Sequence, residues 1–198
     1  MLVKRIFDLA AASLGLLLLS PLLIAVAIWI RTDSPGPALF RQRRIGRFGQ
    51  PFDILKFRTM RADHRDGQSL ITVGIDPRIT RVGQVLRRYK IDELPQLINV
   101  VAGQMSLVGP RPEVERYVAL YPQEVRERVL SVPPGITDYA SIVFRNESDL
   151  LERSPDPERT YIERIMPAKL AHCERYVATR SFWVDLKIIG ATLRSLIL

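Results

Sequence analysis

The segment LRRYKIDELPQL, residues 86–97, carries the densest group of chemically capable side chains in the sequence. Two adjacent carboxylates, Asp92 and Glu93, follow two arginines and a lysine at the expected start of a helix. The helix dipole and nearby cations keep a carboxylate there ionised, which suits a nucleophile or a metal ligand better than a proton donor. Pro95 lacks the backbone N–H that an N-cap side chain usually engages, which leaves part of the Asp92 carboxylate free to react.

A purely structural role remains open for the four residues DELP, 92–95, taken alone. In that interpretation Asp92 only caps the helix and Glu93 only fills an acidic first-turn position. The basic residues elsewhere favour chemistry, because arginine and lysine side chains beside turns and element ends can converge on phosphate groups. The candidates are Lys56, Arg58, Arg78, Arg87, Arg88 and Arg111. Each arginine taken singly could also be solvated surface charge.

Other familiar sites are not indicated. The sequence contains neither GxxxxGK[ST] nor GxGxxG, so neither a P-loop nor a Rossmann fingerprint supplies the phosphate site. His64 and His172 are isolated in sequence, and we do not expect either to be catalytic. The single cysteine, Cys173, excludes an internal disulfide and a cysteine-based zinc site, so the cytosolic side is the expected location.

The composition limits the classes of protein. The 198 residues suffice for one domain, or for one domain with a membrane segment, but not for two full domains. With 47% hydrophobic residues the chain is not intrinsically disordered. A net charge of +8 indicates an anionic partner, which could be nucleic acid, an acidic membrane surface or a phosphorylated small molecule.

Residues 9–30 form an uncharged apolar run of about 33 Å as a straight helix, which is long enough to span a bilayer. Two features favour a re-entrant hairpin over a span. Pro21 near the middle predicts a bend. The side chain of Ser20 can hydrogen-bond to a backbone group that loses its partner at this bend. Basic residues flank both sides, and such flanks prefer the cytoplasmic face: Lys4, Arg5, Arg31, Arg41, Arg43, Arg44 and Arg47. A cleaved signal peptide and a buried core helix are weaker alternatives, because no small-residue cleavage site follows and the run is too long.

The remaining pattern predicts a helix-rich α/β fold and not a doubly wound sheet. Residues 38–60 predict a β-hairpin with one basic face around Gly46 and Gly49, followed by a polar loop over 62–79. Residues 131–144, SVPPGITDYASIVF, are expected to form a loop followed by a strand-like stretch. Helices are expected over 80–90, 93–101, 113–130 with a division at Pro122, 158–178 and 181–197. We therefore expect a re-entrant membrane segment over 1–31 and a small cytosolic catalytic domain over 32–198, with amphipathic helices in the membrane interface.

Several motifs in fixed order resemble those of the bacterial sugar transferases, the monotopic phosphoglycosyl transferases. They are KRIFD, Ser20-Pro21, SPGPALFRQRRIG, FDILKFRTM, DPRITRVGQVLRR, DELPQLINVVAGQMSLVGPRPE and PPGIT, and they run from about Lys4 to Thr137. The resemblance implies transfer of a sugar 1-phosphate from a UDP-sugar to polyprenyl (undecaprenyl) phosphate, with release of UMP. It also implies Mg²⁺, the cytoplasmic face of the bacterial inner membrane, and the first membrane step of surface glycan assembly.

The resemblance also assigns residues. Asp92 is the nucleophile that forms a covalent phosphosugar intermediate, and Glu93 completes the dyad and helps to hold Mg²⁺, with Asp92 as the other candidate ligand. Lys56, Arg88 and Arg111 fall in phosphate-binding motifs. The implied partners are a UDP-sugar, polyprenyl phosphate and membrane lipid, without nucleic acid, and a homodimer is left open.

Two departures from the family pattern concern the substrate. Where the family usually has PGITGxxQVxGR, this chain has PGITDYASIVFRNE over residues 134–147, so Asp138 replaces a glycine. The family tends to have an acidic residue just before a tyrosine near the C-terminus; here Asp156 and Glu158 both precede Tyr161, and neither is assigned. The sequence does not predict which UDP-sugar is used.

Two hypotheses of another class are a membrane-tethered nucleic-acid-binding protein and a catalytically idle membrane scaffold. The first explains the charge, but the aromatic residues are not interleaved with basic ones as a stacking platform requires, and it gives Asp92 and Glu93 no purpose. Metal-dependent release of UMP from a UDP-sugar separates both from the enzyme.

Overall fold

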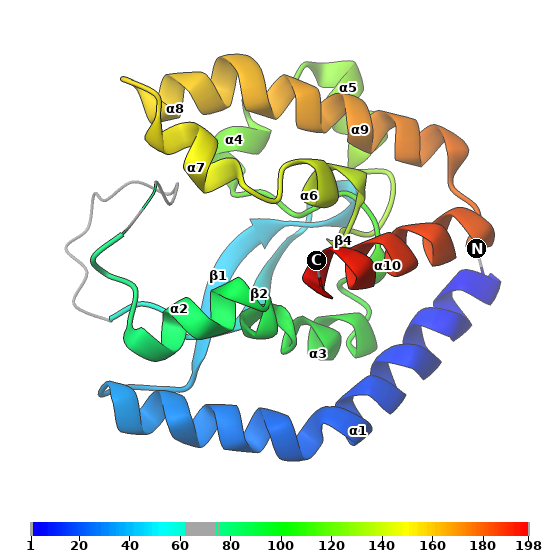
Figure 1. Ribbon diagram of the computed structural model, residues 1–198. Helices are drawn as coiled ribbons and strands as arrows, with labels where there is room; N and C mark the ends of the chain where they lie inside the picture. The colour runs from blue at the N-terminus through cyan, green and yellow to red at the C-terminus, as the bar shows by residue number, and fades with distance from the viewer. Residues whose placement is uncertain (1, 62–73, 75, 198) are drawn as a thin grey trace.

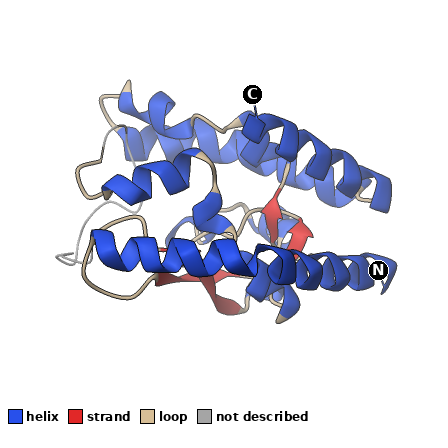
Figure 2. Ribbon diagram, turned by 60° about the horizontal axis from the view of Figure 1, so that its bottom comes forward, coloured by secondary structure: helices blue, strands red, loops and turns tan. Residues whose placement is uncertain are grey.

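The computed structural model describes residues 2–61, 74 and 76–197. Most of the expected 62–79 loop, with His64, lies outside the described residues. Two pairs of short strands are present, β1 (Leu39–Ile45) with β2 (Pro51–Phe57) and β3 (Ser106–Val108) with β4 (Gly135–Thr137). The helices are α1 (Leu2–Asp33), α2 (Arg81–Arg88), α3 (Gln96–Val101), α4 (Glu115–Val118), α5 (Gln123–Val129), α6 (Tyr139–Val143), α7 (Glu147–Glu152), α8 (Pro157–Thr160), α9 (Met166–Thr179) and α10 (Phe182–Ile197). The prediction of a helix-rich α/β fold is confirmed (Figure 2).

The hairpin expected around Gly46 and Gly49 is confirmed: β1 and β2 pair antiparallel, with Gln42 opposite Ile54. The prediction of a single basic face is wrong. Side chains alternate between the two faces of a strand, so Arg41 and Arg43 share one face while Arg44 lies on the other. The second sheet is parallel and joins β3 to β4 across the intervening α4 and α5.

Other differences have local causes. Pro122 divides the expected 113–130 helix into α4 and α5, as predicted. Within the expected loop and strand-like stretch over 131–144, Gly135–Thr137 form β4, but Tyr139–Val143 form the helix α6 instead. The Asp138 side chain accepts a hydrogen bond from the Ser141 N–H at 2.7 Å and caps this helix. The helix expected over 158–178 contains one π-helical turn, Tyr161–Ile165, between α8 and α9.

Helix α1 is one continuous helix through Pro21, and Figure 1 shows it bent along its length. The two arms of a hairpin separated by a break are not seen, since Pro21 removes one backbone hydrogen bond without ending the helix. Of the described helices, α1 alone has the length and apolar composition to cross a membrane. Many of its large apolar side chains are exposed, among them Leu17, Leu18 and Ile24.

The buried side chains of α1 pack along one side of the globular part. In Figure 1, α1 runs along the lower edge of the molecule. Ala12 contacts a cluster from β2 and α3, and Val26 and Ile30 contact a cluster from β2 and α2. A separate core joins α4, α5, α7 and α9 on the opposite side. The hairpin β1–β2 lies between α1 and α9 in Figure 1, and β2 contributes side chains to both clusters that pack on α1.

Polar contacts attach both ends of α1 to the globular part. Near the start, the Lys4 ammonium donates to the Asp185 carboxylate of α10 at 2.5 Å, and the Ser106 hydroxyl of β3 donates to Asp8 at 2.7 Å. After the helix, the Arg58 guanidinium donates to the Ser34 carbonyl at 2.7 Å and to the carbonyl of Pro35. Arg58, expected at a phosphate, is thus buried among backbone carbonyls at the end of α1.

Candidate active site

The two adjacent carboxylates lie on a tight turn between α2 and α3. Lys90 adopts a left-handed conformation with φ 56°, and a short 3₁₀ turn, Ile91–Glu93, follows it. The expectation that Asp92 caps the next helix is wrong, because that helix begins at Gln96 and Pro95 occupies its N-cap position. Asp92 and Glu93 are both buried, with 7% and 9% of their surfaces exposed.

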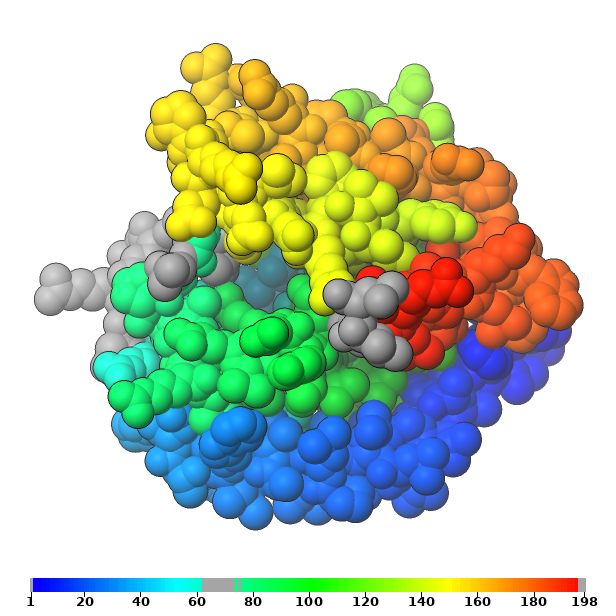
Figure 3. Space-filling model, in the orientation of Figure 1, coloured from blue at the N-terminus to red at the C-terminus, as the bar shows by residue number. Residues whose placement is uncertain are grey.

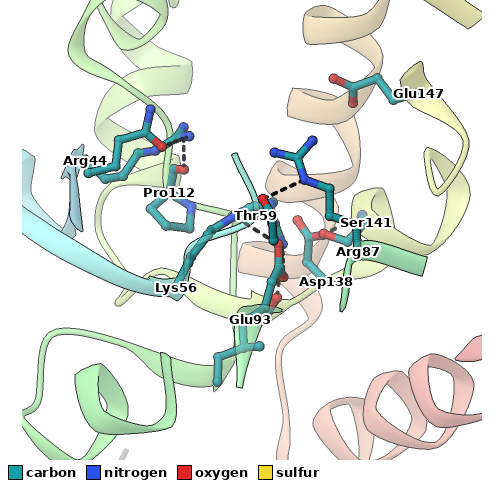
Figure 4. Close-up of polar contacts among 12 residues, drawn as sticks. Arg44, Lys56, Thr59, Arg87, Glu93, Pro112, Asp138, Ser141 and Glu147 are labelled. Carbon is teal, nitrogen blue, oxygen red and sulfur yellow. Dashed lines mark hydrogen bonds and ion pairs between the residues drawn. The ribbon is translucent and has the colours of Figure 1, made fainter. Parts of the chain in front are cut away.

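Glu93 is held by two cations from distant parts of the chain. The Lys56 ammonium of β2 lies 3.0 Å from Oε1, and the Arg111 guanidinium donates to both carboxylate oxygens, with Nη1 3.0 Å from Oε2. Figure 4 shows Lys56 and Glu93 pointing toward each other. Burial alone would raise the pKa of Glu93, but Arg111 and Lys56 together hold that pKa well below its usual range. The carboxylate of Glu93 is therefore ionised.

Asp92 has a different environment from its neighbour. Among the described residues, its buried Oδ1 has no hydrogen-bond partner. Burial, and next the charge of Glu93, raise the pKa of Asp92, while Lys56, Lys90 and Arg87 oppose the rise. The sequence predicts that the helix dipole and nearby cations hold this carboxylate ionised; instead, burial and Glu93 outweigh the three cations, and the net direction of the pKa is upward. One carboxylate is clamped and the other keeps an oxygen unused by the protein.

A cavity of about 490 Å³ lies beside Glu93, which forms part of its wall together with Lys90 and Arg111, whereas Asp92 is not one of the lining residues. Figure 3 shows the molecule hollowed between the α6–α7 segment, in yellow, and the α2–α3 segment, in green. Residues from β1, α4, α6, α7, α9 and α10 complete the lining. This volume lies within the range of about 300–1,000 Å³ that binds small molecules and cofactors.

The other expected basic residues lie at different distances from the pair. The Arg87 Nε donates to the Thr59 hydroxyl at 2.9 Å, and the charge of Arg87 interacts with that of Asp92. Arg78 pairs with Asp76, whose pKa it lowers. Arg88 is exposed and lies over the ring of Tyr89. The structure therefore brings Lys56, Arg87 and Arg111 to the carboxylate pair and leaves Arg58 elsewhere.

The sequence analysis missed a second polar group in the cavity wall. Glu113 accepts hydrogen bonds from Arg44 at 3.1 Å and from the Tyr161 hydroxyl at 2.7 Å. Burial raises the pKa of Tyr161, so its hydroxyl stays protonated and donates. Arg44 had been counted only among the basic flanks of the membrane segment, and the alternation within the strand was the available signal that it faces away from Arg43.

Neither acidic residue that precedes Tyr161 in sequence lies in the cavity wall. Asp156 caps α8 by accepting from the Arg159 N–H at 3.0 Å, and Glu158 pairs with Arg116 at 2.6 Å. Glu147 of α7 lines the cavity instead, paired with Lys169 at 2.9 Å. The 138–147 segment therefore does contribute to the cavity, through α6 and the start of α7.

In the described part of the chain, no group of three or more His, Cys, Asp or Glu side chains could hold a metal ion. This absence leaves Mg²⁺ possible, because Mg²⁺ is commonly held by one or two carboxylates together with substrate phosphates and water. The adjacent pair Asp92 and Glu93, with a buried oxygen that has no hydrogen-bond partner among the described residues, fits that mode of binding.

Comparisons with known proteins agree with the motifs. The chain matches the family described as bacterial sugar transferase over residues 1–198. It is 40% identical over 194 residues to the UDP-glucose:undecaprenyl-phosphate glucose-1-phosphate transferase of Escherichia coli (strain K12), covering 96% of this chain and 39% of that protein. It is 36% identical over 197 residues to an N-acetylgalactosaminephosphotransferase of Aeromonas hydrophila that uses undecaprenyl phosphate, covering 98% of this chain and 44% of that protein.

A third relative has nearly the same length. The chain is 39% identical over 202 residues to the exopolysaccharide production protein PSS of Rhizobium leguminosarum bv. phaseoli, covering 98% of this chain and 95% of that protein. The chain spans less than half the length of the relatives from E. coli and A. hydrophila. The similarity to those two proteins is therefore a similarity to part of each.

Proposed function

Because this chain belongs to the bacterial sugar transferase family, we propose that it transfers a sugar 1-phosphate from a UDP-sugar to undecaprenyl phosphate and releases UMP. The printed activities of the relatives from E. coli and A. hydrophila support this reaction, and the name of the R. leguminosarum relative supports a role in exopolysaccharide production. In this role the protein performs the first membrane step of surface glycan assembly.

One structural observation carries the proposal. Glu93, clamped by Lys56 and Arg111, lines a cavity of about 490 Å³, and the adjacent buried Asp92 has an oxygen without a hydrogen-bond partner among the described residues. An idle scaffold or a nucleic-acid-binding protein does not require two desolvated carboxylates, which cost free energy to bury. A reaction at phosphorus does, because it needs a nucleophile held apart from water and beside cations.

The residues divide the chemistry as follows. The ionised Asp92 attacks the phosphorus that carries the sugar; an O–P bond forms to Asp92, and the bond to the UMP oxygen breaks. Lys56, Arg87 and Arg111 lie where they can offset the negative charge of the equatorial phosphate oxygens. The phosphate of undecaprenyl phosphate then attacks the aspartyl-phosphosugar, which releases Asp92 and forms the lipid-linked sugar diphosphate.

We further propose that Glu93 holds Mg²⁺ together with phosphate oxygens of the substrate, and that Asp92 is the second candidate ligand. When bound, Mg²⁺ neutralises charge on the phosphate groups. Lys56 and Arg111 keep Glu93 ionised and fix its direction.

The proposed membrane arrangement is monotopic, with residues 1–31 re-entering the cytoplasmic leaflet of the inner membrane and residues 32–198 forming the catalytic domain on that face. Contacts at both ends of α1 support it, since Lys4 reaches Asp185 and Arg58 reaches Ser34 in the same globular part. A span perpendicular to the bilayer would draw α2 and α3, which pack along α1, into the lipid.

Helix α10 is proposed to lie in the membrane interface beside the start of α1. Its Trp183 is 71% exposed, and its Phe182 contacts Phe7 of α1 with ring centroids 5.2 Å apart. Tryptophan is enriched at the boundary between lipid and water, which makes this exposed ring a suitable interfacial anchor.

The test is UMP release from a UDP-sugar in the presence of undecaprenyl phosphate and Mg²⁺. Asp92→Asn should abolish turnover and the covalent phosphosugar adduct detected by mass spectrometry, because an amide is a very poor nucleophile. Folding should be retained, since Asp92 caps no helix in this structure. Asp149→Asn, a change of an exposed carboxylate, is the matched control and should retain activity. Wild-type rates in Asp92→Asn would disprove the covalent mechanism.

A further inference from the structure

We propose that the end of the cavity formed by Glu113, Glu147, Tyr161 and Lys169 binds the hydroxyl groups of the donor's sugar ring, and that Glu147 selects which sugar is accepted. This inference rests on the proposed function, because it places one part of the UDP-sugar within the same cavity. Beyond the proposed function, it states which part of the substrate binds at this end of the cavity and which residue determines the specificity for the sugar.

The two ends of the cavity differ in charge. At the Glu93 end, the wall holds the cations Lys90 and Arg111 beside the single carboxylate of Glu93, so the charge of the wall there is positive and suits phosphate. At the other end each carboxylate has one cationic partner, Arg44 for Glu113 and Lys169 for Glu147. This end thus holds two neutral ion pairs, whose carboxylates would repel a diphosphate. It therefore suits a neutral part of the substrate that is rich in hydroxyl groups.

Glu147 and Lys169 provide hydrogen-bonding groups of both kinds. Their paired atoms, Oε2 and Nζ, lie 2.9 Å apart, and the side chains keep 25% and 17% of their surfaces exposed toward the cavity and its mouth. Figure 4 shows the Glu147 carboxylate directed away from its own ribbon toward α9. A sugar hydroxyl both donates and accepts, so a carboxylate beside an ammonium can engage two neighbouring hydroxyls.

The two carboxylates of this end differ in how fully the protein occupies them. Glu113 accepts from Arg44, from the Tyr161 hydroxyl and from the Val114 N–H. Within the described part of the chain, the side chain of Glu147 accepts a hydrogen bond only at Oε2, from Lys169, so Oε1 is available to a ligand. Glu113 is thus fixed as part of the wall, whereas Glu147 has an oxygen ready to accept from a substrate hydroxyl.

Aromatic side chains complete a surface suited to a pyranose ring. Tyr117 and Tyr161 line the same end with ring centroids 4.9 Å apart, and Phe144 of the α6–α7 segment lines it as well. Ligand pockets combine such apolar walls with a few polar groups that fix orientation. Tyr117 and Tyr161 are 3% exposed, so the C–H groups of a sugar would pack chiefly on the partly exposed Phe144 while its hydroxyls reach Glu147 and Lys169.

The order of bonds in the substrate favours the sugar over the nucleotide at this end. The phosphorus that Asp92 attacks is the one that carries the sugar, so the sugar remains attached beside Glu93 after UMP has left. The sugar must therefore occupy space continuous with the Glu93 end of the cavity, and the Glu147 end is continuous with it.

The test measures kcat/KM for UMP release from UDP-glucose and from UDP-N-acetylgalactosamine, and inhibition by UMP, in the full chain. Glu147→Gln and Glu147→Asp should each change the ratio of the two kcat/KM values by about tenfold or more, because a charged hydrogen bond to one hydroxyl is lost or displaced. Inhibition by UMP should stay unchanged. Glu163→Gln, in an exposed ion pair with Arg159 outside the cavity, is the matched control and should leave the ratio unchanged.

The alternative results are distinct. An unchanged ratio in both Glu147 variants, shown by thermal unfolding to be folded, overturns the inference. An equal loss for both donors together with weaker inhibition by UMP places the nucleotide at this end and also overturns it. If Glu147→Gln does not fold, the ratio of the two kcat/KM values is measured in Glu147→Asp and Lys169→Arg, and an unchanged ratio in both overturns the inference. Wild-type protein that releases no UMP from any UDP-sugar would overturn the proposed function itself.

Discussion

The hydroxyl of Ser20 donates a hydrogen bond to the carbonyl oxygen of Leu17, with 2.8 Å between the two oxygens. Leu17 precedes Pro21 by four residues, so its carbonyl is the acceptor that an N–H at position 21 would engage in an α-helix. Proline has no N–H, and the serine hydroxyl supplies the missing donor. This contact explains how α1 continues as one helix through a proline in its middle.

Replacing Ser20 by Ala should destabilise the protein in lipid by about 1–3 kcal/mol, because the Leu17 carbonyl loses its donor where no water replaces it. The measurement is the midpoint of thermal unfolding in lipid nanodiscs. Ser13→Ala is the control, since Ser13 is exposed on the same helix and its hydroxyl makes no hydrogen bond with the described residues. Equal midpoints for the two variants would contradict this role of Ser20.

The topology of α1 is tested by cysteine labelling. In a Cys173→Ser background, Val3→Cys and Asp33→Cys should both react only with reagent supplied from the cytoplasmic side, because contacts hold both ends of α1 against one globular part. Pro21→Ala should straighten the helix and shift a fraction of molecules to a span, opposed by the cost of moving basic residues across. Periplasmic labelling of Val3→Cys in the protein with Pro21 would establish an ordinary transmembrane anchor.

The pH dependence of activity should report Asp92. Its pKa is raised above the usual value, so the carboxylate is protonated and inactive below that pKa and ionised above it. The value of kcat/KM should therefore fall as the pH falls through this raised pKa. The charge of Lys56 lowers the pKa of Asp92, so Lys56→Gln should move the acidic limb of the kcat/KM profile to higher pH.

The control for this experiment is Lys187→Gln, which removes an exposed lysine from α10 and should leave the limb in place. A limb that stays fixed or moves to lower pH in Lys56→Gln would show that another group controls the acidic side of the profile.

Arg58→Met should lower stability without changing the KM for the UDP-sugar. The guanidinium donates to carbonyls at the end of α1, and each hydrogen bond from a charged donor contributes about 1.5–3 kcal/mol. Thermal unfolding and kinetics on the folded protein separate the two effects. Arg153→Met, at an exposed arginine, is the control. A higher KM for the UDP-sugar with an unchanged midpoint of thermal unfolding would show that Arg58 binds substrate phosphate and does not stabilise the end of α1.

Local pattern was sufficient for much of the fold. The apolar run predicts α1, the turn residues around Gly46 and Gly49 predict the β1–β2 hairpin, and Pro122 predicts the division between α4 and α5. Helix α6 was missed because the apolar alternation near 139–144 suits a strand, while the Asp138 cap that favours a helix depends on one side-chain contact. Short elements of this kind are decided by single interactions rather than by periodicity.

For the candidate active site, too, part could be predicted from the sequence and part depended on the tertiary structure. The sequence by itself determined the adjacent carboxylates Asp92 and Glu93, since neighbours in the chain remain neighbours in space, and its ordered motifs indicated the family. Only the tertiary structure decided that Lys56 and Arg111 clamp Glu93 while Arg58 holds the end of α1. All three are basic residues beside turns, and their partners lie 18 to 37 residues away in the chain. Partners so distant meet through the packing of strands and helices, which local pattern does not encode.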